Sequence, residues 1–254
     1  MTFATYPSLR DRPVFVSGGG SGIGASIVEH FCAQGSRVAF VDVSEEPSRR
    51  LVETITAAGH PAPVFLPCDL RDIPALQDAV ARAAEAVGPI RVLVNNAARD
   101  DRHKWDEVTP AYWDERIAVN LRHQFFAAQA VAPMMKAAGG GSIINMGSIS
   151  WMIGQGGMAA YTASKSAVLG LTRSLARDLG PFRIRVNSVA PGWVMTERQM
   201  ELWLDDEGRR EIDRRQCLKD LLQPADIARM ILFLAADDSA MCTNQSYIVD
   251  GGWV

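Results

Sequence analysis

A tyrosine and a lysine in the second half of the chain have the spacing of a pair that could transfer a proton. Tyr161 and Lys165 lie four residues apart in the string YTASK, within a helix predicted over residues 158–179. Residues at i and i+4 share one face of a helix, and both side chains can act as general acids or bases. The pattern therefore indicates an acid–base pair, although the same spacing also occurs on ordinary surface helices.

Two further polar residues fall where they could serve the same site. Ser148 follows a strand predicted over residues 142–146, and the active sites of open α/β sheets lie at the carboxyl ends of strands. Asn120 falls in the middle of a predicted helix, where asparagine is a poor helix former and needs another reason to be present. The candidate catalytic residues are therefore Asn120, Ser148, Tyr161 and Lys165.

A glycine-rich segment near the N-terminus has the context of a phosphate-binding loop. It reads SGGGSGIG over residues 17–24, after one predicted strand and before a predicted helix. Glycines let a phosphate approach the main chain, and a helix N-terminus offers free N–H groups and the positive end of the helix dipole. This strand–loop–helix context is typical of a dinucleotide-binding loop. The candidate cofactor-binding residues of the loop are Gly18, Ser21, Gly22, Ile23 and Gly24.

An acidic residue lies where it could select the dinucleotide. Asp42 ends the second predicted strand, at the position where a carboxylate accepts hydrogen bonds from the adenosine ribose hydroxyls. It would also repel a 2′-phosphate, and Ser44 follows instead of an arginine that could bind one. The sequence therefore favours NAD over NADP. The alternative is that Asp42 only forms a turn or caps a helix.

These candidates are positioned by a regular alternation of strands and helices. The predicted strands cover residues 13–17, 37–42, 63–68, 90–95, 142–146, 184–189 and 247–249. The predicted helices cover residues 21–34, 44–58, 72–87, 109–138, 158–179 and 225–235. Continuously apolar strands indicate a parallel sheet buried on both faces, and the alternation is that of the doubly wound class. We expect a single Rossmann-type α/β domain over residues 1–254, with a seven-stranded parallel sheet and helices on both faces.

The least regular stretch of the chain is residues 192–222, which carries Trp193, Met195, Met200 and Trp203 among many charges. A segment of this kind after a sheet strand can be a mobile substrate lid. The alternative is a surface helix with apolar anchors.

Composition argues against several other classes of protein. The 254 residues carry a net charge of −3, and their basic residues are scattered, so neither nucleic acid nor an anionic membrane is an expected partner. The cysteines, Cys32, Cys68, Cys217 and Cys242, are widely spaced, which argues against a zinc site or a disulfide framework and favours buried free thiols. Residues 1–12 lack the apolar run of a signal peptide, and no apolar stretch approaches membrane-spanning length. We expect a cytoplasmic protein without a bound metal.

Beyond these separate signals, the chain resembles the short-chain dehydrogenase/reductase superfamily over nearly all of its length. The motifs that carry the resemblance are, in order, the glycine loop, Asp69, the string NNAA at 95–98, Asn120, Ser148, YTASK at 161–165 and PGWVMT at 191–196. Two departures are conservative: Ser17 replaces the more usual threonine, and Ala98 replaces the usual glycine.

The resemblance implies a role for each candidate catalytic residue. Tyr161 would be the general base in oxidation, taking the proton of the substrate hydroxyl as hydride leaves for the nicotinamide. Because a free tyrosine has a pKa of about 10, Lys165 and the positive nicotinamide would have to favour the phenolate and lower that pKa. Lys165 would also hydrogen-bond the nicotinamide ribose. Ser148 would hold the substrate oxygen, and Asn120 would anchor a water that relays protons from Lys165.

The resemblance also implies the remaining cofactor contacts. Asp69 and Leu70 would flank the adenine, and Asn96 and Ala97 would pass under the cofactor. The carboxamide end would be held by Pro191, Gly192, Val194 and Thr196, with Tyr161 and Lys165 nearby.

Local strings outside the shared core of the superfamily bear on the substrate. They are DDRH at 100–103, YWDERI at 112–117, NLRH at 120–123, SISW at 148–151 and QCLK at 216–219, and they resemble NAD-dependent sugar 1-dehydrogenases, those acting on D-xylose among them. A sugar needs a pocket with many hydrogen-bonding groups and an apolar or aromatic face, at the carboxyl ends of the strands. The candidate substrate-binding residues are Asp100, Asp101, His103, Ser148, Ser150, Trp151, Gln155, Tyr161 and Trp193.

Alternatives remain for some of these residues. The string at 100–103 could be a solvated charge run or a subunit contact, and Trp151 could simply cover the cofactor. We interpret His103 as a hydrogen-bonding residue and not as a metal ligand, because no companion ligands are evident.

The expected reaction is the NAD-dependent oxidation of an aldose, such as D-xylose, L-arabinose, D-galactose or L-fucose, at C1 to the lactone. One alternative is a dehydrogenase of another secondary alcohol: a keto-deoxy sugar acid, a polyol or a 3-oxoacyl group. Another is a nucleotide-sensing or scaffolding protein without catalysis, against which the intact catalytic set argues. By resemblance we expect a homotetramer. The apolar ending Trp253-Val254 suits an interface, unless it packs on its own subunit.

Overall fold

Seven parallel strands form the sheet at the centre of the computed structural model, which describes residues 3–254. They are β1 (Pro13–Ser17), β2 (Arg37–Asp42), β3 (Val64–Pro67), β4 (Val92–Asn95), β5 (Gly141–Met146), β6 (Ile184–Pro191) and β7 (Ser246–Val249). Their order across the sheet is β3-β2-β1-β4-β5-β6-β7, and every neighbouring pair is parallel. The predicted sheet is confirmed. Met1 and Thr2, the start of the segment in which we expected no signal peptide, lie outside the described residues.

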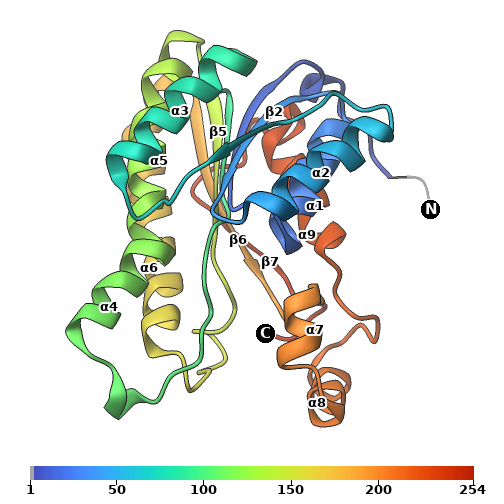
Figure 1. Ribbon diagram of the computed structural model, residues 1–254, viewed down its shortest axis with the longest axis vertical. Helices are drawn as coiled ribbons and strands as arrows, with labels where there is room; N and C mark the ends of the chain where they lie inside the picture. The colour runs from blue at the N-terminus through green and yellow to red at the C-terminus, as the bar shows by residue number, and fades with distance from the viewer. Residues whose placement is uncertain (1–2) are drawn as a thin grey trace.

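Helices cover both faces of this sheet (Figure 1). One face carries α1 (Gly22–Ala33), α2 (Glu45–Ala57) and α9 (Pro224–Ala235), and the other carries α3 (Ile73–Val87), α5 (His123–Ala137) and α6 (Ala159–Leu179). Alternate strand residues point to opposite faces, so Val16 of β1 joins the apolar cluster under α1 and α9 while Phe15 joins the cluster under α3 and α5. The expected burial of the sheet on both faces is thereby confirmed.

The helix predicted over residues 109–138 is interrupted near its middle. It consists of α4 (Pro110–Ile117), a single π-helical turn η3 (Ala118–Arg122) and then α5. Asn120 lies in this turn and is completely buried. Such turns are rare and frequently lie at functional sites. The sequence pattern did not predict this interruption. Asn120 points inward to hydrogen-bond with Arg99, which lies in another part of the chain.

The stretch over residues 192–222 contains two short helices, α7 (Glu197–Leu202) and α8 (Asp206–Arg215). Thr196 and Asp205 cap them by accepting hydrogen bonds from the main chain of Gln199 and Gly208. Both helices stand beyond the carboxyl ends of the strands, across from α4 (Figure 1). Short 3₁₀ turns complete the elements: η1 (Pro7–Leu9), η2 (Trp105–Glu107), η4 (Gly180–Phe182) and η5 (Asp237–Ser239).

The four cysteines are free, but they are not all buried as we expected. Cys32 and Cys68 are buried and Cys242 is half-buried, whereas Cys217 is exposed because it follows the last turn of α8 at the surface. Among residues 3–254, no helix is both long and apolar enough to span a bilayer.

Candidate active site

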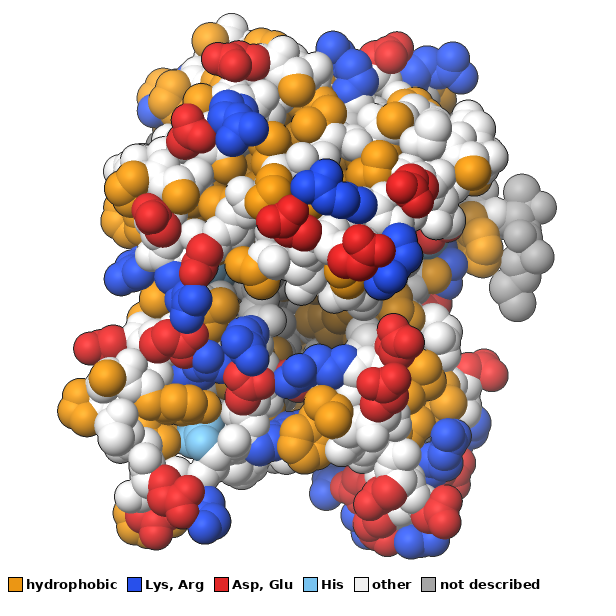
Figure 2. Space-filling model, in the orientation of Figure 1, with side chains coloured by type: hydrophobic (Ala, Val, Ile, Leu, Met, Phe, Trp, Pro, Cys, Tyr) orange, Lys and Arg blue, Asp and Glu red, His pale blue; other side chains and the backbone are white. Residues whose placement is uncertain are grey.

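A cleft of about 1570 Å³ runs along the carboxyl ends of the strands. Its lining includes Asp42 at the end of β2, Met146 at the end of β5 and Pro191 at the end of β6. The strand order explains its place, because the chain leaves β1 towards one edge of the sheet and β4 towards the other, which opens a crevice between them. Figure 2 shows the surface hollowed below its middle, between the part that carries α4 and the part formed by α7 and α8.

The glycine-rich loop forms one wall of this cleft and is packed too closely for larger residues. A Cβ at Gly24 would lie 1.8 Å from the main-chain oxygen of Gly18, which itself has a φ of +66°. The Asn96 amide donates to the main-chain oxygens of Ser17 (3.1 Å) and Gly18 (2.8 Å). The Ser17 hydroxyl accepts from the main-chain nitrogens of Asn96 (3.0 Å) and Ala97 (3.2 Å). The serine that replaces the usual threonine thus still braces the loop, whose main chain faces an approaching phosphate.

Asp42 holds the far side of the loop. Its Oδ2 accepts from the main-chain nitrogen of Gly20 (2.9 Å), and its Oδ1 accepts from that of Ser44 (2.9 Å). A carboxylate oxygen can accept more than one hydrogen bond, so both oxygens can still bind ribose hydroxyls in the cleft. The fixed negative charge would repel a phosphate at the same place.

Three of the four candidate catalytic residues meet in the cleft. Tyr161 and Lys165 come from α6, and Ser148 comes from the turn after β5. The Lys165 Nζ lies 5.6 Å from the centroid of the Tyr161 ring and donates a hydrogen bond to the main-chain oxygen of Met146 (2.7 Å). The helix spacing predicted from the sequence therefore brings the pair together at the end of β5.

Burial dominates the protonation of this pair. Desolvation and the negative charge of Asp100 raise the pKa of Tyr161 to about 12, although the hydrogen bond from Ser148 and the positive charge of Arg102 act in the opposite direction. Desolvation also lowers the pKa of Lys165 to about 7, against the attraction of Asp100. We expected Lys165, together with the positive nicotinamide, to lower the pKa of Tyr161. The protein's own groups raise that pKa instead, with desolvation as the largest cause, and the effect of the nicotinamide stays a prediction.

Asn120 lies behind the cleft and not among the residues that line it. Its Oδ1 accepts from the main-chain nitrogen of Arg99 (2.8 Å), and its Nδ2 donates to the main-chain oxygen of the same residue (3.1 Å). Both ends of the amide are therefore paired with the loop after β4. The side chain holds this loop in place, and the water-mediated proton relay expected at Asn120 stays a prediction.

All the candidate cofactor-binding residues line the cleft. They are Gly18, Ser21, Gly22, Ile23, Gly24, Asp42, Asp69, Leu70, Asn96, Ala97, Tyr161, Lys165, Pro191, Gly192, Val194 and Thr196. Trp253 and Val254 line it as well, so the apolar C-terminus borders the cleft of its own chain.

The candidate substrate-binding residues divide into two groups. Asp100, Ser148, Ser150, Gln155, Tyr161 and Trp193 line the cleft, whereas Asp101, His103 and Trp151 do not. The Ser150 hydroxyl is buried and has no hydrogen-bond partner within residues 3–254. The indole nitrogen of Trp203, a second cleft residue, likewise finds no partner in the described chain. Two buried polar groups of cleft residues thus lack a hydrogen-bond partner in the described chain.

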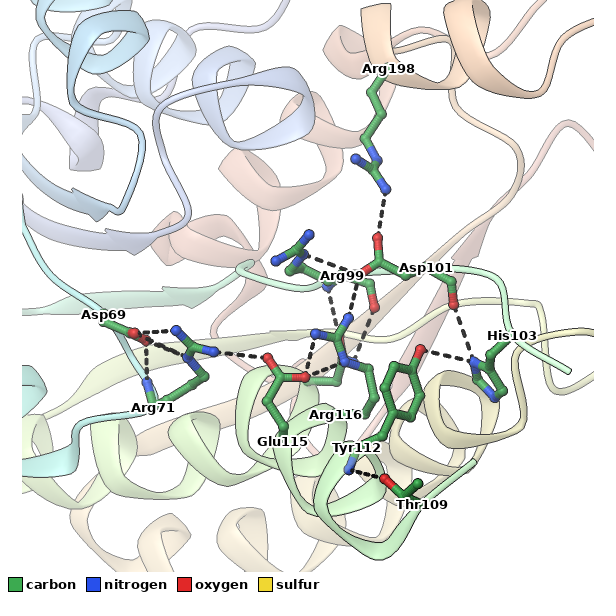
Figure 3. A network of polar contacts seen from close by, with 11 residues as sticks. Asp69, Arg71, Arg99, Asp101, His103, Thr109, Tyr112, Glu115, Arg116 and Arg198 are labelled. Carbon is green, nitrogen blue, oxygen red and sulfur yellow. Dashed lines mark hydrogen bonds and ion pairs between the residues drawn. The ribbon is translucent and has the colours of Figure 1, made fainter. Parts of the chain in front are cut away.

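Asp101 is the centre of a network of ion pairs and not a cleft residue (Figure 3). The side chain of Arg116 is only 7% exposed and contacts the carboxylates of both Asp101 and Glu115. The Arg198 guanidinium of α7 lies 2.8 Å from the other oxygen of Asp101. Burial alone would raise the pKa of Asp101, but Arg99, Arg116 and Arg198 together lower it below its usual value. Asp101 therefore joins α4 to α7.

His103 and Trp151 also stand outside the cleft. Nδ1 of His103 shares a hydrogen bond with the Tyr112 hydroxyl (3.1 Å), and its main-chain nitrogen donates to the oxygen of Gly157 (2.8 Å). The ring borders a separate pocket of about 430 Å³ beside Trp105. Ion pairs and hydrogen bonds hold the side chains of Asp101 and His103 outside the lining of the cleft. A substrate-binding role for Asp101, His103 and Trp151 stays a prediction.

Arg102, Gln199 and Trp203 are among the cleft residues that were not predicted from the sequence. The Arg102 guanidinium lies 5.0 Å from the centroid of the Trp203 ring. The string TERQ at 196–199 has the pattern of a helix capping box, which could have located the start of α7. The side chain of Gln199 instead reaches Asp100 and Trp193, and no local pattern predicts those contacts.

Comparisons with known proteins cover almost the whole chain. A family model described as "Enoyl-(Acyl carrier protein) reductase" matches residues 18–254. The chain is 51% identical to "Probable galactose dehydrogenase GalD" of Rhizobium meliloti, over 97% of this chain and 96% of that protein. It is 48% identical to D-xylose 1-dehydrogenase of Caulobacter vibrioides, over 100% of both. The crystal structure of a 3-oxoacyl-[acyl-carrier protein] reductase with bound NAD from Brucella melitensis is also similar, with 30% identity, a TM-score of 0.88 and coverage of 100% of this chain and 98% of that one.

Proposed function

The chain belongs to the short-chain dehydrogenase/reductase family, and on this basis we propose that it oxidises an aldose at C1 to the lactone with NAD. The observation that carries the proposal is that Tyr161, Lys165 and Ser148 meet in one cleft, between a glycine loop and a group of polar and aromatic side chains. D-xylose, L-arabinose, D-galactose and L-fucose are the proposed substrates. Relatives at 48% and 51% identity are named for D-xylose and galactose.

The cleft fits a dinucleotide. The loop from Gly18 to Gly24 leaves no room for a Cβ at Gly24 and presents main chain to a pyrophosphate. Asp42 would bind the adenosine ribose, Asp69 and Leu70 would border the adenine, and the residues from Pro191 to Thr196 would hold the carboxamide. When bound, NAD supplies the acceptor for the hydride. The carboxylate of Asp42, followed by Ser44 and not by a basic residue, favours NAD over NADP.

The proton step falls to Tyr161. In the oxidation direction its phenolate takes the proton of the C1 hydroxyl, and Ser148 donates a hydrogen bond to the same oxygen. Lys165, held on Met146, lies close to the ring, and whenever it carries its proton its positive charge favours the phenolate. For Asn120 we propose that it positions the loop after β4, on which Asp100 lies.

Polar groups around the reacting centre support a sugar over a lipid substrate. The carboxylate of Asp100 and the amide of Gln155 are presented by residues that line the cleft, beside the unpaired hydroxyl of Ser150 and the unpaired indole nitrogen of Trp203. A largely apolar ligand would leave several of these groups unsatisfied, which is costly in a closed site.

We extend the proposal to the whole protein. Residues 1–254 would form a single NAD-binding domain, with residues 192–222 as a substrate lid. The protein would act in the cytoplasm as a homotetramer. Exposed aromatic side chains on α4 and α5, Trp113 and Phe125, support an interface on that face. The mass of the protein in solution, measured by light scattering, tests the tetramer.

The substrate is tested by following NADH formation with NAD and a panel of aldoses, polyols, keto-deoxy sugar acids and 3-oxoacyl or 3-hydroxyacyl compounds. Turnover of one or more aldoses, with a lactone detected by NMR before it hydrolyses, is the expected result. Turnover of only a polyol, a sugar acid or an acyl substrate would show that the substrate belongs to that class and not to the aldoses. NAD binding without any turnover would indicate a sensing or scaffolding protein.

A further inference from the structure

Two consecutive residues of α7 contact two consecutive carboxylates of the loop after β4. Arg198 Nη2 lies 2.8 Å from Asp101, and Gln199 Nε2 donates to Asp100 Oδ2 at 2.8 Å. The first contact belongs to the network of Figure 3 and lies at the border of the cleft, because Arg198 lines the cleft and Asp101 does not. The second lies inside it, because both Gln199 and Asp100 line the cleft. The pair of contacts fixes α7 against the loop beside the reacting centre.

Gln199 also holds an indole with the other end of its amide. The Trp193 Nε1 donates to Gln199 Oε1 at 3.0 Å. The opposite edge of the same indole packs on Gly208 of α8, where a Cβ would lie 2.8 Å from Cη2 of Trp193. The ring is therefore held at both edges, and one glutamine sets the positions of a carboxylate and of an aromatic face.

The Asp100 carboxylate keeps one oxygen free for a ligand. Gln199 occupies Oδ2, whereas the nearest cation to Oδ1 is Arg198 Nε at 3.6 Å, beyond hydrogen-bond distance. The side chain is 21% exposed. Asp100 lines the same cleft as Tyr161 and Lys165, so a ligand bound beside the reacting groups can reach this side chain. A hydroxyl that donates to a carboxylate makes a short and strong hydrogen bond.

We propose that Gln199 is a positioning residue that builds a subsite for a neutral sugar, in which Asp100 accepts a non-reacting hydroxyl and the Trp193 indole covers the C–H face of the ring. This inference rests on the proposed function. A carboxylate and an aromatic face suit the two kinds of surface that a sugar ring offers. The negative charge of Asp100 disfavours a sugar acid at the same place.

A cation elsewhere in the cleft could recognise a different substrate, a sugar acid. The Arg102 guanidinium lies over the Trp203 indole, and its Nη1 contacts the sulfur of Met158 (2.7 Å). No carboxylate of residues 3–254 forms an ion pair with Arg102. Arg102 can therefore pair with the carboxylate of a sugar acid. A preference for a neutral sugar therefore indicates recognition by Asp100, whereas a preference for a sugar acid indicates recognition by Arg102.

The first test compares Asp100→Asn and Gln199→Met with the wild type. The matched control is Met200→Leu, on the same helix but 47% exposed. We expect KM for the aldose to rise about 10-fold or more in both variants, since a hydrogen bond to a charged group is lost. KM for NAD should stay within about 2-fold, and the kcat of Gln199→Met within about 3-fold. Unchanged thermal unfolding would show that the variants are folded.

The pH profile of Asp100→Asn adds a readout that a purely structural role would not move. The Asp100 charge raises the pKa of Tyr161, so its removal lowers that pKa and makes the base available at lower pH. The rise of kcat/KM with pH should shift towards acid in Asp100→Asn and stay in place in Met200→Leu.

The second test identifies the hydroxyl with monodeoxy analogues of the aldose that the wild type oxidises best. Loss of the hydroxyl bound by Asp100 should lower kcat/KM by about 30-fold in the wild type but by less than about 3-fold in Asp100→Asn.

Equal losses in both enzymes at every position, or a wild-type KM in Gln199→Met, would overturn the subsite and leave the proposed function standing. A preferred sugar acid whose binding is lost in Arg102→Gln would overturn it as well. Failure of the wild type on every aldose would instead refute the proposed function itself.

Discussion

Lys165 lies beside Tyr161 but does not hydrogen-bond to it: its Nζ is 5.6 Å from the ring centroid and donates to the main-chain oxygen of Met146 at 2.7 Å. The end of β5 thus fixes the ammonium of a residue on α6. The lysine can influence the phenol through its charge, while burial sets the pKa of both groups. The first two predictions follow from this relationship.

Tyr161→Phe should lower kcat by about 10³-fold, because general-base catalysis contributes about 10²- to 10⁴-fold. Phenylalanine keeps the ring and its packing, so the affinity for NAD, measured by fluorescence quenching, should change little. The residual rate should also lose its increase with pH. Tyr6→Phe is the matched control, since the hydrogen bond of Tyr6 to Gln34 uses its main-chain nitrogen. A Tyr161→Phe enzyme with near-native turnover would contradict the proposed base.

Lys165→Met should abolish turnover. It should also remove a destabilising effect of the buried lysine on the folded protein, and this effect depends on pH. Burial lowers the pKa of Lys165 to about 7 from 10.5, so between these values the unfolded chain binds more protons than the folded protein. Stability contributed by this site therefore rises with pH over that window, and the cost is fully present below pH 7. The free energy of unfolding, variant minus wild type, should be more positive at pH 6.5 than at pH 10.

Urea unfolding of both proteins at the two pH values measures this difference. Lys136→Met, which removes an exposed lysine, is the control. The free energy of unfolding of Lys165→Met minus that of the wild type could instead be equal at pH 6.5 and pH 10. That result would show that burial does not lower the pKa of Lys165 in the folded protein.

Asp42→Ser combined with Ser44→Arg should move the cofactor preference towards NADP. Removal of the carboxylate eliminates both the ribose contact and the repulsion of a 2′-phosphate, and the arginine supplies a cation for it. We expect KM for NAD to rise about 10-fold and NADP to become a substrate. Glu46→Gln, an exposed change on the neighbouring helix α2, should leave both KM values unchanged. A wild type that already uses NADP as well as NAD would refute the role given to Asp42.

Arg116→Met should destabilise the protein, because it leaves the carboxylates of Asp101 and Glu115 without their shared partner. Removing one member of a buried ion pair costs about 3–5 kcal/mol. Since Asp101 and Glu115 are 27% and 28% exposed, we expect about 2 kcal/mol in the free energy of unfolding. Arg122→Met, which removes an exposed arginine on the next turn, is the control. Equal stability of the two variants would show that the network of Figure 3 carries little energy.

Most of the fold and half of the site follow from local patterns. Apolar runs predicted the seven strands, and a strand–loop–helix context located the phosphate loop, because such signals lie within a few neighbouring residues. The spacing of Tyr161 and Lys165 placed both on one helix face, as the structure confirms.

The remaining features depend on partners far apart in the chain. Asp100 and Gln199 are separated by 99 positions, and Asn120 turns inward to pair with Arg99. The ion pairs of Asp101 with Arg116 and Arg198 also join residues that are distant in the sequence. The raised pKa of Tyr161 arises from burial, which no local pattern reveals.

The most direct measurement of the central claim follows the hydrogen at C1. The aldose that the enzyme oxidises fastest is prepared with deuterium at C1 and incubated with NAD, and the products are examined by NMR and mass spectrometry. The account predicts that the deuterium moves to the nicotinamide ring, that a lactone without deuterium forms, and that Tyr161→Phe forms neither product at an appreciable rate. Turnover that leaves the deuterium on the sugar would show that another carbon is oxidised, and would contradict the account.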